Sequence, residues 1–177
     1  MQYIIGILLV FIIVTAGWLI FFYSKMANNK ILVEDSWTQL DLQHTKRNDL
    51  ILEYVDMVFG FEAYKQEILL QIIQARANLI DAKAAIDIMK FSQKISRLLE
   101  RLFTVSEKCI VLKTEASFVL LEQQMRELEE KIEICRYIYN DTVSSYNKFL
   151  NIFPNNVCGM ILGVEELPYF RLMRDKE

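Results

Sequence analysis

The chain has 177 residues, enough for one domain and a membrane anchor, since a typical domain holds about 100 to 150 residues. Its formal net charge is -3, and proteins bind phosphate backbones through clustered positive charge, so nucleic acid is not expected as a partner. The three cysteines, Cys109, Cys135 and Cys158, form no Cys-x-x-Cys pair, which favours free thiols in a reducing compartment over a disulfide framework.

The first predicted element is a transmembrane helix over residues 4–23, with residues 1–23 as the membrane anchor. Ile4–Tyr23 is an uncharged run long enough to cross the roughly 30 Å hydrocarbon core of a bilayer as a helix. A cleaved signal peptide is the alternative, but it would have a basic start, and Met1-Gln2-Tyr3 has no basic side chain. Lys25 and Lys30 follow the span and no Lys or Arg precedes it. We expect a single-pass protein of the inner (plasma) membrane, and the positive-inside rule predicts its N-terminus outside and its bundle in the cytoplasm.

Residues 24–30 are the predicted juxtamembrane linker, because Asn28-Asn29 interrupts the apolar run. A helical bundle is predicted over residues 31–163. Its first helix begins at Ile31 and ends at Gly60, since glycine adopts the left-handed conformation of a helix C-terminus without steric penalty.

One long second helix is predicted from Phe61 to Val105, because no Gly or Pro interrupts this interval. Its apolar positions keep a three-and-four spacing with a slip at Ala84; a break near 78–81 is the alternative. The predicted core stripe is Leu70, Ile73, Ala77, Ile80, Ala84, Ile88, Phe91, Ile95, Leu98, Leu102 and Val105.

The lengths of these two helices predict a second membrane contact. At about 1.5 Å per residue the first helix is roughly 43 Å long and the second roughly 65 Å. The turn after an unbroken second helix would extend toward the bilayer and contact membrane lipid. Its apolar residues, between Lys108 and Lys113, are Cys109, Ile110, Val111 and Leu112. A hydrophobic cap folded back onto the bundle is the alternative.

The third predicted helix carries a heptad seam, which must be buried against other helices. The seam residues are Phe118, Leu121, Met125, Leu128, Ile132, Cys135, Tyr139, Thr142, Tyr146, Phe149 and Phe153. A short helix follows Pro154, and residues 164–177 form a C-terminal tail. The predicted fold is all-α: an N-terminal transmembrane helix, an antiparallel bundle of three long helices and a short C-terminal helix.

Two blocks of residues carry a family resemblance. The first includes Ser36-Trp37, Lys46-Arg47-Asn48-Asp49-Leu50, Gly60 and Ala75-Arg76. The second includes Phe118, Leu121, Glu129, Arg136 and the repeated Tyr139-Asn140 and Tyr146-Asn147 before Phe153-Pro154. Together they resemble the LemA family of bacterial single-span membrane proteins with a helical-bundle domain. The chain departs from the family pattern at Leu52, where the family usually has Pro, at His44, where Leu is common, and at Cys109-Ile110, where Tyr-Pro is usual. The resemblance implies no established catalytic activity. It implies scaffolding or assembly at a membrane, sometimes with a membrane-bound zinc protease.

The predicted topology brings segments 47–61 and 136–154 to the same end of the bundle. There Arg47 and Asp49 are expected to pair with the polar groups of the Tyr-Asn repeat, because a buried Arg needs its donors satisfied. The alternative is that the Tyr and Asn side chains only fix helix register. The partner or network candidates are Arg47, Asp49, Gly60, Arg136, Tyr139, Asn140, Tyr146, Asn147 and Pro154.

Enzyme chemistry has little support in the sequence. His44 is the single histidine, which excludes a multi-histidine zinc site and a di-iron bundle, so no metal and no cofactor is predicted. Its expected role is that of a partly buried hydrogen-bonding group.

The predicted function is a non-catalytic scaffold or assembly protein that forms a homo-oligomer or docks a membrane partner. Its docking surfaces would be the distal end of the bundle or the apolar residues off the core stripes: Leu42, Leu50, Leu52, Met57, Phe59, Val119 and Leu120. An adaptor for a membrane-bound zinc metalloprotease is the alternative.

Overall fold

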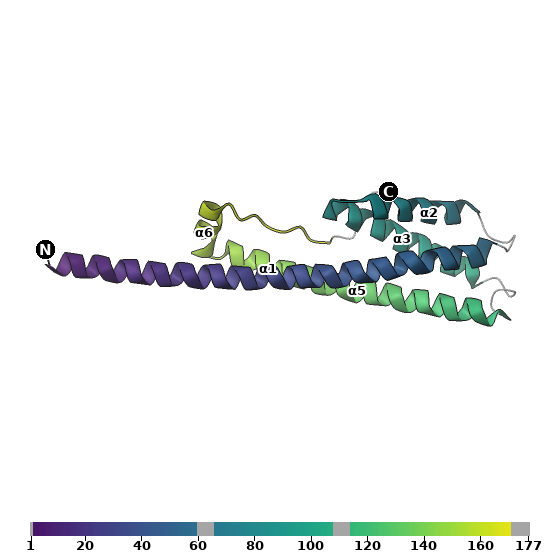
Figure 1. Cartoon of the computed structure of the whole chain (residues 1–177), viewed down its shortest axis with the longest axis horizontal. Coiled ribbons are helices and arrows are strands. Elements are labelled where there is room, and N and C mark those ends of the chain that lie inside the picture. The colour runs from purple at the N-terminus through teal and green to yellow at the C-terminus, as the bar shows by residue number, and fades with distance from the viewer. Residues whose placement is uncertain (1, 60–65, 108–113, 171–177) are drawn as a thin grey trace. The chain divides into compact units, whose positions relative to one another are not determined.

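The computed structural model describes residues 2–59, 66–107 and 114–170, and every regular element in these residues is a helix (Figure 1). The helices are α1 (Gln2–Phe59), α2 (Gln66–Asp81), α3 (Ala85–Ser106), α5 (Ala116–Asn151) and α6 (Asn155–Leu162). The predicted all-α bundle is confirmed. The chain divides into two compact units: an anchor unit of Met1–Trp37 and Ile138–Tyr169, and a bundle unit of Thr38–Tyr137 and Phe170–Glu177.

Helix α1 is continuous over 58 residues. Among the described residues it is the helix long and apolar enough to cross a membrane, and its most apolar 18-residue window has no residue buried by the rest of the protein. The helix continues through Asn28-Asn29. The expected linker at 24–30 is therefore no break in secondary structure, since Asn costs a helix interior only a fraction of a kcal/mol.

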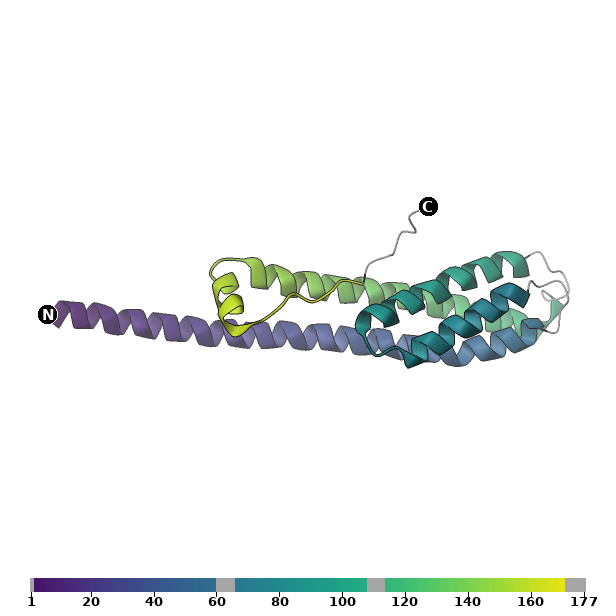
Figure 2. The same cartoon turned by 90° about the horizontal axis from the view of Figure 1, so that it is seen from above.

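The prediction of one long second helix is wrong. Helix α2 ends at Asp81 and α3 begins at Ala85, just beyond the alternative break at 78–81. Ala84 is extended, with φ -83° and ψ 135°, and its carbonyl accepts hydrogen bonds from the N–H groups of Asp87 and Ile88. The two helices fold back and pack against each other (Figure 2). Because the break contains neither Gly nor Pro, tertiary packing and not backbone chemistry determines it.

Helix α2 buries a different face from the predicted one. The buried residues are Ile68, Leu69, Ile72, Ala75 and Leu79. The predicted core residues Leu70, Ile73 and Ile80 are 61%, 40% and 57% exposed, and Ala77 is also exposed. We call Leu70, Ile73, Ala77 and Ile80 the α2 stripe. On α3 the predicted stripe is buried at Ile95, Leu98 and Leu102.

The core of the bundle unit surrounds Tyr54, which lies near the C-terminal end of α1. Its ring centroid is 5.9 Å from that of Phe103 on α3 and 5.5 Å from that of Phe118 on α5. The end of α3 and the start of α5 therefore lie beside the C-terminal end of α1. The predicted membrane contact at residues 109–112 is therefore left without support, because it required an unbroken second helix. Cys109, Ile110, Val111 and Leu112 themselves lie outside the described residues.

The heptad seam of α5 is confirmed over most of its length. The buried seam residues are Phe118, Leu121, Met125, Leu128, Ile132, Tyr139 and Tyr146. Cys135, Thr142 and Phe149 are half-buried, whereas Phe153 is exposed. In the last turns the burial moves to Val143, Asn147 and Leu150.

In the anchor unit, the end of α5 lies antiparallel beside α1. The rings of Phe149 and Phe22 are stacked with centroids 5.6 Å apart, and the hydroxyls of Thr142 and Ser36 are 2.9 Å apart. The sequence predicted contacts of the segment 136–154 with residues 47–61, whereas the contacts within the anchor unit are with the earlier part of α1. The predicted short helix after Pro154 is present as α6.

Candidate functional site

A fully buried arginine lies at the centre of a polar network in the bundle unit. Arg47 of α1 has no exposed surface. Its Nη2 donates a hydrogen bond to Ser92 Oγ at 2.8 Å, and its Nη1 donates to Ser96 Oγ at 2.9 Å and to Glu129 Oε1 at 3.1 Å. Ser92 and Ser96 are one turn apart on α3 and Glu129 is on α5, so one guanidinium connects three helices.

The carboxylate of Glu129 neutralises the buried charge of Arg47, and both of its oxygens accept hydrogen bonds. Its Oε2 accepts a hydrogen bond from Ser96 Oγ at 2.6 Å, while its Oε1 accepts from Arg47. Burial lowers the pKa of Arg47 and the neighbouring Glu129 opposes that shift. The guanidinium remains charged because arginine is not deprotonated in proteins. The pair satisfies the requirement that a buried charge be paired and hydrogen-bonded.

His44 extends this network on α1. Its Nε2 lies 2.8 Å from Ser92 Oγ, and the side chain is almost fully buried. Burial, followed by the positive charges of Arg47 and Arg136, lowers the pKa of His44 to about 3. The imidazole is therefore neutral at physiological pH and suits an acceptor role toward Ser92. The prediction that His44 is a hydrogen-bonding group is confirmed. We call His44, Arg47, Ser92, Ser96 and Glu129 the arginine network.

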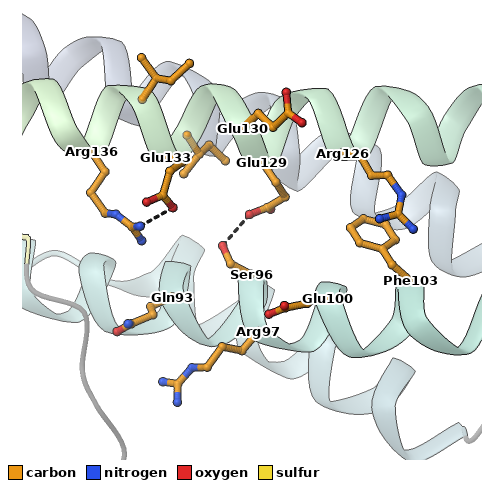
Figure 3. Close-up of a pocket in the computed structure, with 12 residues that line it drawn as sticks. Gln93, Ser96, Arg97, Glu100, Phe103, Arg126, Glu129, Glu130, Glu133 and Arg136 are labelled. Atoms are coloured by element: carbon orange, nitrogen blue, oxygen red, sulfur yellow. Dashed lines mark hydrogen bonds and ion pairs between the residues drawn. The ribbon is translucent and has the colours of Figure 1, made fainter.

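A groove of about 860 Å³ between α3 and α5 adjoins the arginine network (Figure 3). Glu129 and Ser96 lie on its wall, with their hydrogen bond facing the space between the helices (Figure 3). The lining residues are Gln93, Ser96, Arg97, Glu100, Phe103, Arg126, Glu129, Glu130, Ile132, Glu133, Ile134 and Arg136.

Two arginines along the α3–α5 groove form ion pairs with glutamates. Arg126 binds Glu122 at 2.6 Å, and its guanidinium lies 4.3 Å from the ring centroid of Phe103. Arg136 forms an ion pair with Glu133 (Figure 3). Among the described residues no group of three or more His, Cys, Asp or Glu side chains is placed to hold a metal ion.

A smaller cavity of about 430 Å³ lies between α1 and α2. Asp49 and His44 contribute to its wall from α1, and Arg76 from α2. The Nε of Arg76 donates a hydrogen bond of 2.8 Å to the carbonyl of Asn48. The cavity therefore lies beside a contact that joins α2 to α1.

Comparison with known families supports the resemblance seen in the sequence. A model of the LemA family matches residues 36–177, which include the arginine network and all of α2 to α6. The chain belongs to the LemA family. Comparison with curated proteins found no match.

In this LemA-family chain the Tyr-Asn repeat holds the segment that follows α6. Tyr139 donates its hydroxyl hydrogen to the carbonyl of Pro168 at 3.0 Å. The Asn147 side chain donates to the carbonyl of Leu167 and accepts from the Leu167 N–H, both at 2.9 Å. We call Tyr139, Asn147, Leu167 and Pro168 the C-terminal clasp. Tyr146, the residue before Asn147, is also buried, and burial raises the pKa of both Tyr139 and Tyr146.

The predicted pairing of Arg47 and Asp49 with the Tyr-Asn repeat is wrong. Arg47 binds the serines of α3 and Glu129, whereas Tyr139 and Asn147 bind the C-terminal segment. Asp49 is exposed. The physical reason is the chain reversal at 82–84, which places α3 against Arg47.

The remaining candidates have separate places. Arg136 lines the α3–α5 groove and its guanidinium lies 5.7 Å from the ring centroid of Phe170. Asn140 is half-buried on α5, and Pro154 directly precedes α6. Gly60 lies outside the described residues. Sequence reasoning did not select Ser92 and Ser96; their four-residue spacing on one helix face was the signal for them.

Proposed function

We propose that this LemA-family chain is a non-catalytic, membrane-anchored scaffold that self-associates through the α2 stripe. The observation that carries the proposal is the exposure of this stripe: Leu70, Ile73 and Ile80 are 61%, 40% and 57% exposed. The other apolar face of α2 is already buried in the core of the bundle unit. An apolar stripe left over on a core helix is the kind of surface that another helix covers.

The spacing of the α2 stripe favours a second copy of the same helix as the partner. Leu70, Ile73, Ala77 and Ile80 follow one another at steps of three, four and three, which is the a/d spacing of a coiled coil. Two copies of such a stripe present the same surface to each other, as an isologous dimer requires. Ala77, as the small member of the stripe, allows the two helices to approach closely.

Charges beside the α2 stripe are consistent with parallel pairing. With Leu70 at position a, Arg76 occupies position g and Asp81 the following position e. In a parallel coiled coil a g residue meets the e residue five positions later on the other helix. The Nε of Arg76 binds the Asn48 carbonyl of its own chain, so its Nη groups are the ones that would face Asp81 of the second copy across the apolar seam.

Mass measurement of the detergent-solubilised full chain tests self-association. We expect the wild type to form a dimer or larger assembly, and the double variant Ile73→Glu/Ile80→Glu to be a monomer. Ile86→Glu is the matched control, because Ile86 is 54% exposed on α3 and lies outside the stripe. A monomeric wild type, or a double variant that still assembles, would refute the proposal. A monomer that co-purifies with an integral membrane protease would favour the adaptor role that the family resemblance implies.

The proposed orientation places the bundle unit in the cytoplasm. Its support is the distribution of positive charge: Lys25 and Lys30 follow the apolar run of α1, and no Lys or Arg precedes it. A C-terminal fusion to alkaline phosphatase, which is active only outside the cytoplasm, should be inactive. Full phosphatase activity in whole cells would reverse the orientation.

A further inference from the structure

We infer that α6 and the turn leading into it form a second membrane contact, with the apolar side chains of this segment inserted into the lipid surface beside α1. The inference rests on the membrane anchoring contained in the proposed function. The bilayer, and not another protein, covers this segment in the anchored protein. We call residues 152–162 the α6 patch.

Nearly every large apolar side chain in the α6 patch faces away from the protein. Phe153, Met160 and Ile161 are 78%, 84% and 77% exposed, whereas Cys158 and Gly159 are buried. Ile152, Val157 and Leu162 are also exposed. Monomeric soluble proteins rarely expose contiguous apolar surface of this kind, so the α6 patch requires a cover.

No charged residue interrupts the α6 patch or its approach. From Phe149 to Val164 the sequence contains only apolar residues, Asn, Pro and Gly. An unpaired charge in the hydrocarbon region is costly, and a segment without charge avoids that cost. The polar side chains of Asn155 and Asn156 suit the headgroup region. Asn155 donates its side-chain N–H to the carbonyl of Phe149, and Asn156 accepts a hydrogen bond from the N–H of Val157.

The position of the α6 patch within the anchor unit identifies the bilayer as its cover. Phe149, three residues before the patch, stacks on Phe22 in the last turn of the predicted span, with ring centroids 5.6 Å apart. Figures 1 and 2 both show α6 beside the first half of α1. On α1 the neighbouring Ile20 and Phe21 are 72% and 61% exposed. The patch is therefore next to the surface of α1 that lipid covers in an anchored protein.

Basic residues lie where the headgroups would be. Lys25 follows the span by two residues, and Lys148 immediately precedes Phe149; both side chains are exposed. Lysines at this level favour anionic headgroups through electrostatic attraction near the surface. A short apolar segment that follows such a lysine has the composition of an interfacial contact.

Fluorescent probes at single cysteines test this contact in the full chain. In a background with Cys109→Ser, Cys135→Ser and Cys158→Ala, an environment-sensitive probe is attached at Met160→Cys. The protein is reconstituted into vesicles of phosphatidylglycerol and phosphatidylethanolamine, with and without nitroxide-labelled lipid. We expect the Met160 probe to show blue-shifted emission and to lose emission when nitroxide lipid is present. A probe at Tyr137→Cys, which is 74% exposed in the bundle unit, should keep its emission.

A third probe separates failure of this inference from failure of the anchor. The probe at Ile20→Cys reports on the span itself. If Ile20 is quenched and Met160 is not, the anchor stands and the α6 contact is refuted. If neither is quenched, both are refuted. A Met160 probe with blue-shifted emission but no quenching would show that protein covers the α6 patch, which also overturns the inference.

Discussion

Replacing His44 with Leu should remove a large part of the acid sensitivity of the fold. An unfolded chain binds a proton on histidine below about pH 6.5, whereas burial and the nearby arginines lower the pKa of His44 to about 3 in the folded protein. Between these two values the unfolded state binds more protons, so the free energy of unfolding falls as the pH falls. The loss begins below pH 6.5 and is complete near pH 3.

Its size follows from the two pKa values. At pH 4 the unfolded state gains about 3 kcal/mol from protonation of this histidine, and by pH 3 or below the total approaches about 5 kcal/mol. His44→Leu lacks this contribution, although it also removes the hydrogen bond to Ser92 at every pH. The expected result is therefore a difference in slope: between pH 7 and pH 4 the wild type loses about 3 kcal/mol more than the variant.

Urea denaturation of the detergent-solubilised chain, followed by circular dichroism at several pH values, measures this difference. Carboxylates titrate in both proteins and cancel in the comparison. Thr45→Val is the matched control, because Thr45 is the exposed neighbour of His44 and does not titrate. Equal slopes for wild type and His44→Leu would refute the assignment of a buried, neutral imidazole.

Three further predictions concern other parts of the fold. Arg47→Met should lower the free energy of unfolding by about 3–5 kcal/mol because it leaves Glu129 without its partner. The double variant Arg47→Met/Glu129→Leu should recover part of this loss in the same urea assay, and additive losses would argue against the pair. Asn147→Ala removes both hydrogen bonds to Leu167 and should lower the stability of the C-terminal clasp by about 1–3 kcal/mol. The loss should be seen as faster hydrogen exchange at the Leu167 amide, and unchanged exchange would contradict the clasp. Gly163→Ala should lower the stability of the α6 end by about 1 kcal/mol, because Gly163 has φ 64° at the C-terminus of that helix. The loss is measured as faster proteolysis near α6, and an equal rate of proteolysis would contradict the need for glycine.

The α5 seam could be predicted from sequence because α5 offers one strong stripe. Its apolar residues follow a single three-and-four pattern, and most of them are buried. Helix α2 offers two such patterns, one through Ile72 and Leu79 and the other through Ile73 and Ile80. Periodicity alone cannot decide which of two stripes faces the core, because both satisfy the same spacing. The choice depends on the neighbouring helices, and the core uses the first stripe.

The chain reversal between α2 and α3 explains two errors of the sequence prediction: the wrong buried face of α2, and the absence of Ser92 and Ser96 from the candidate site. Residues 82–84 are Ala, Lys and Ala, which favour helix, so local propensity predicts continuity. Once α3 folds back, Ser92 and Ser96 lie opposite Arg47, and their hydroxyls accept hydrogen bonds from a guanidinium that also binds Glu129. A sliding of α3 by one residue would turn both serines away from Arg47, since successive helical residues differ by about 100° in direction. The arginine network therefore fixes the register of α3 against α1 and α5, and the same packing leaves the α2 stripe exposed.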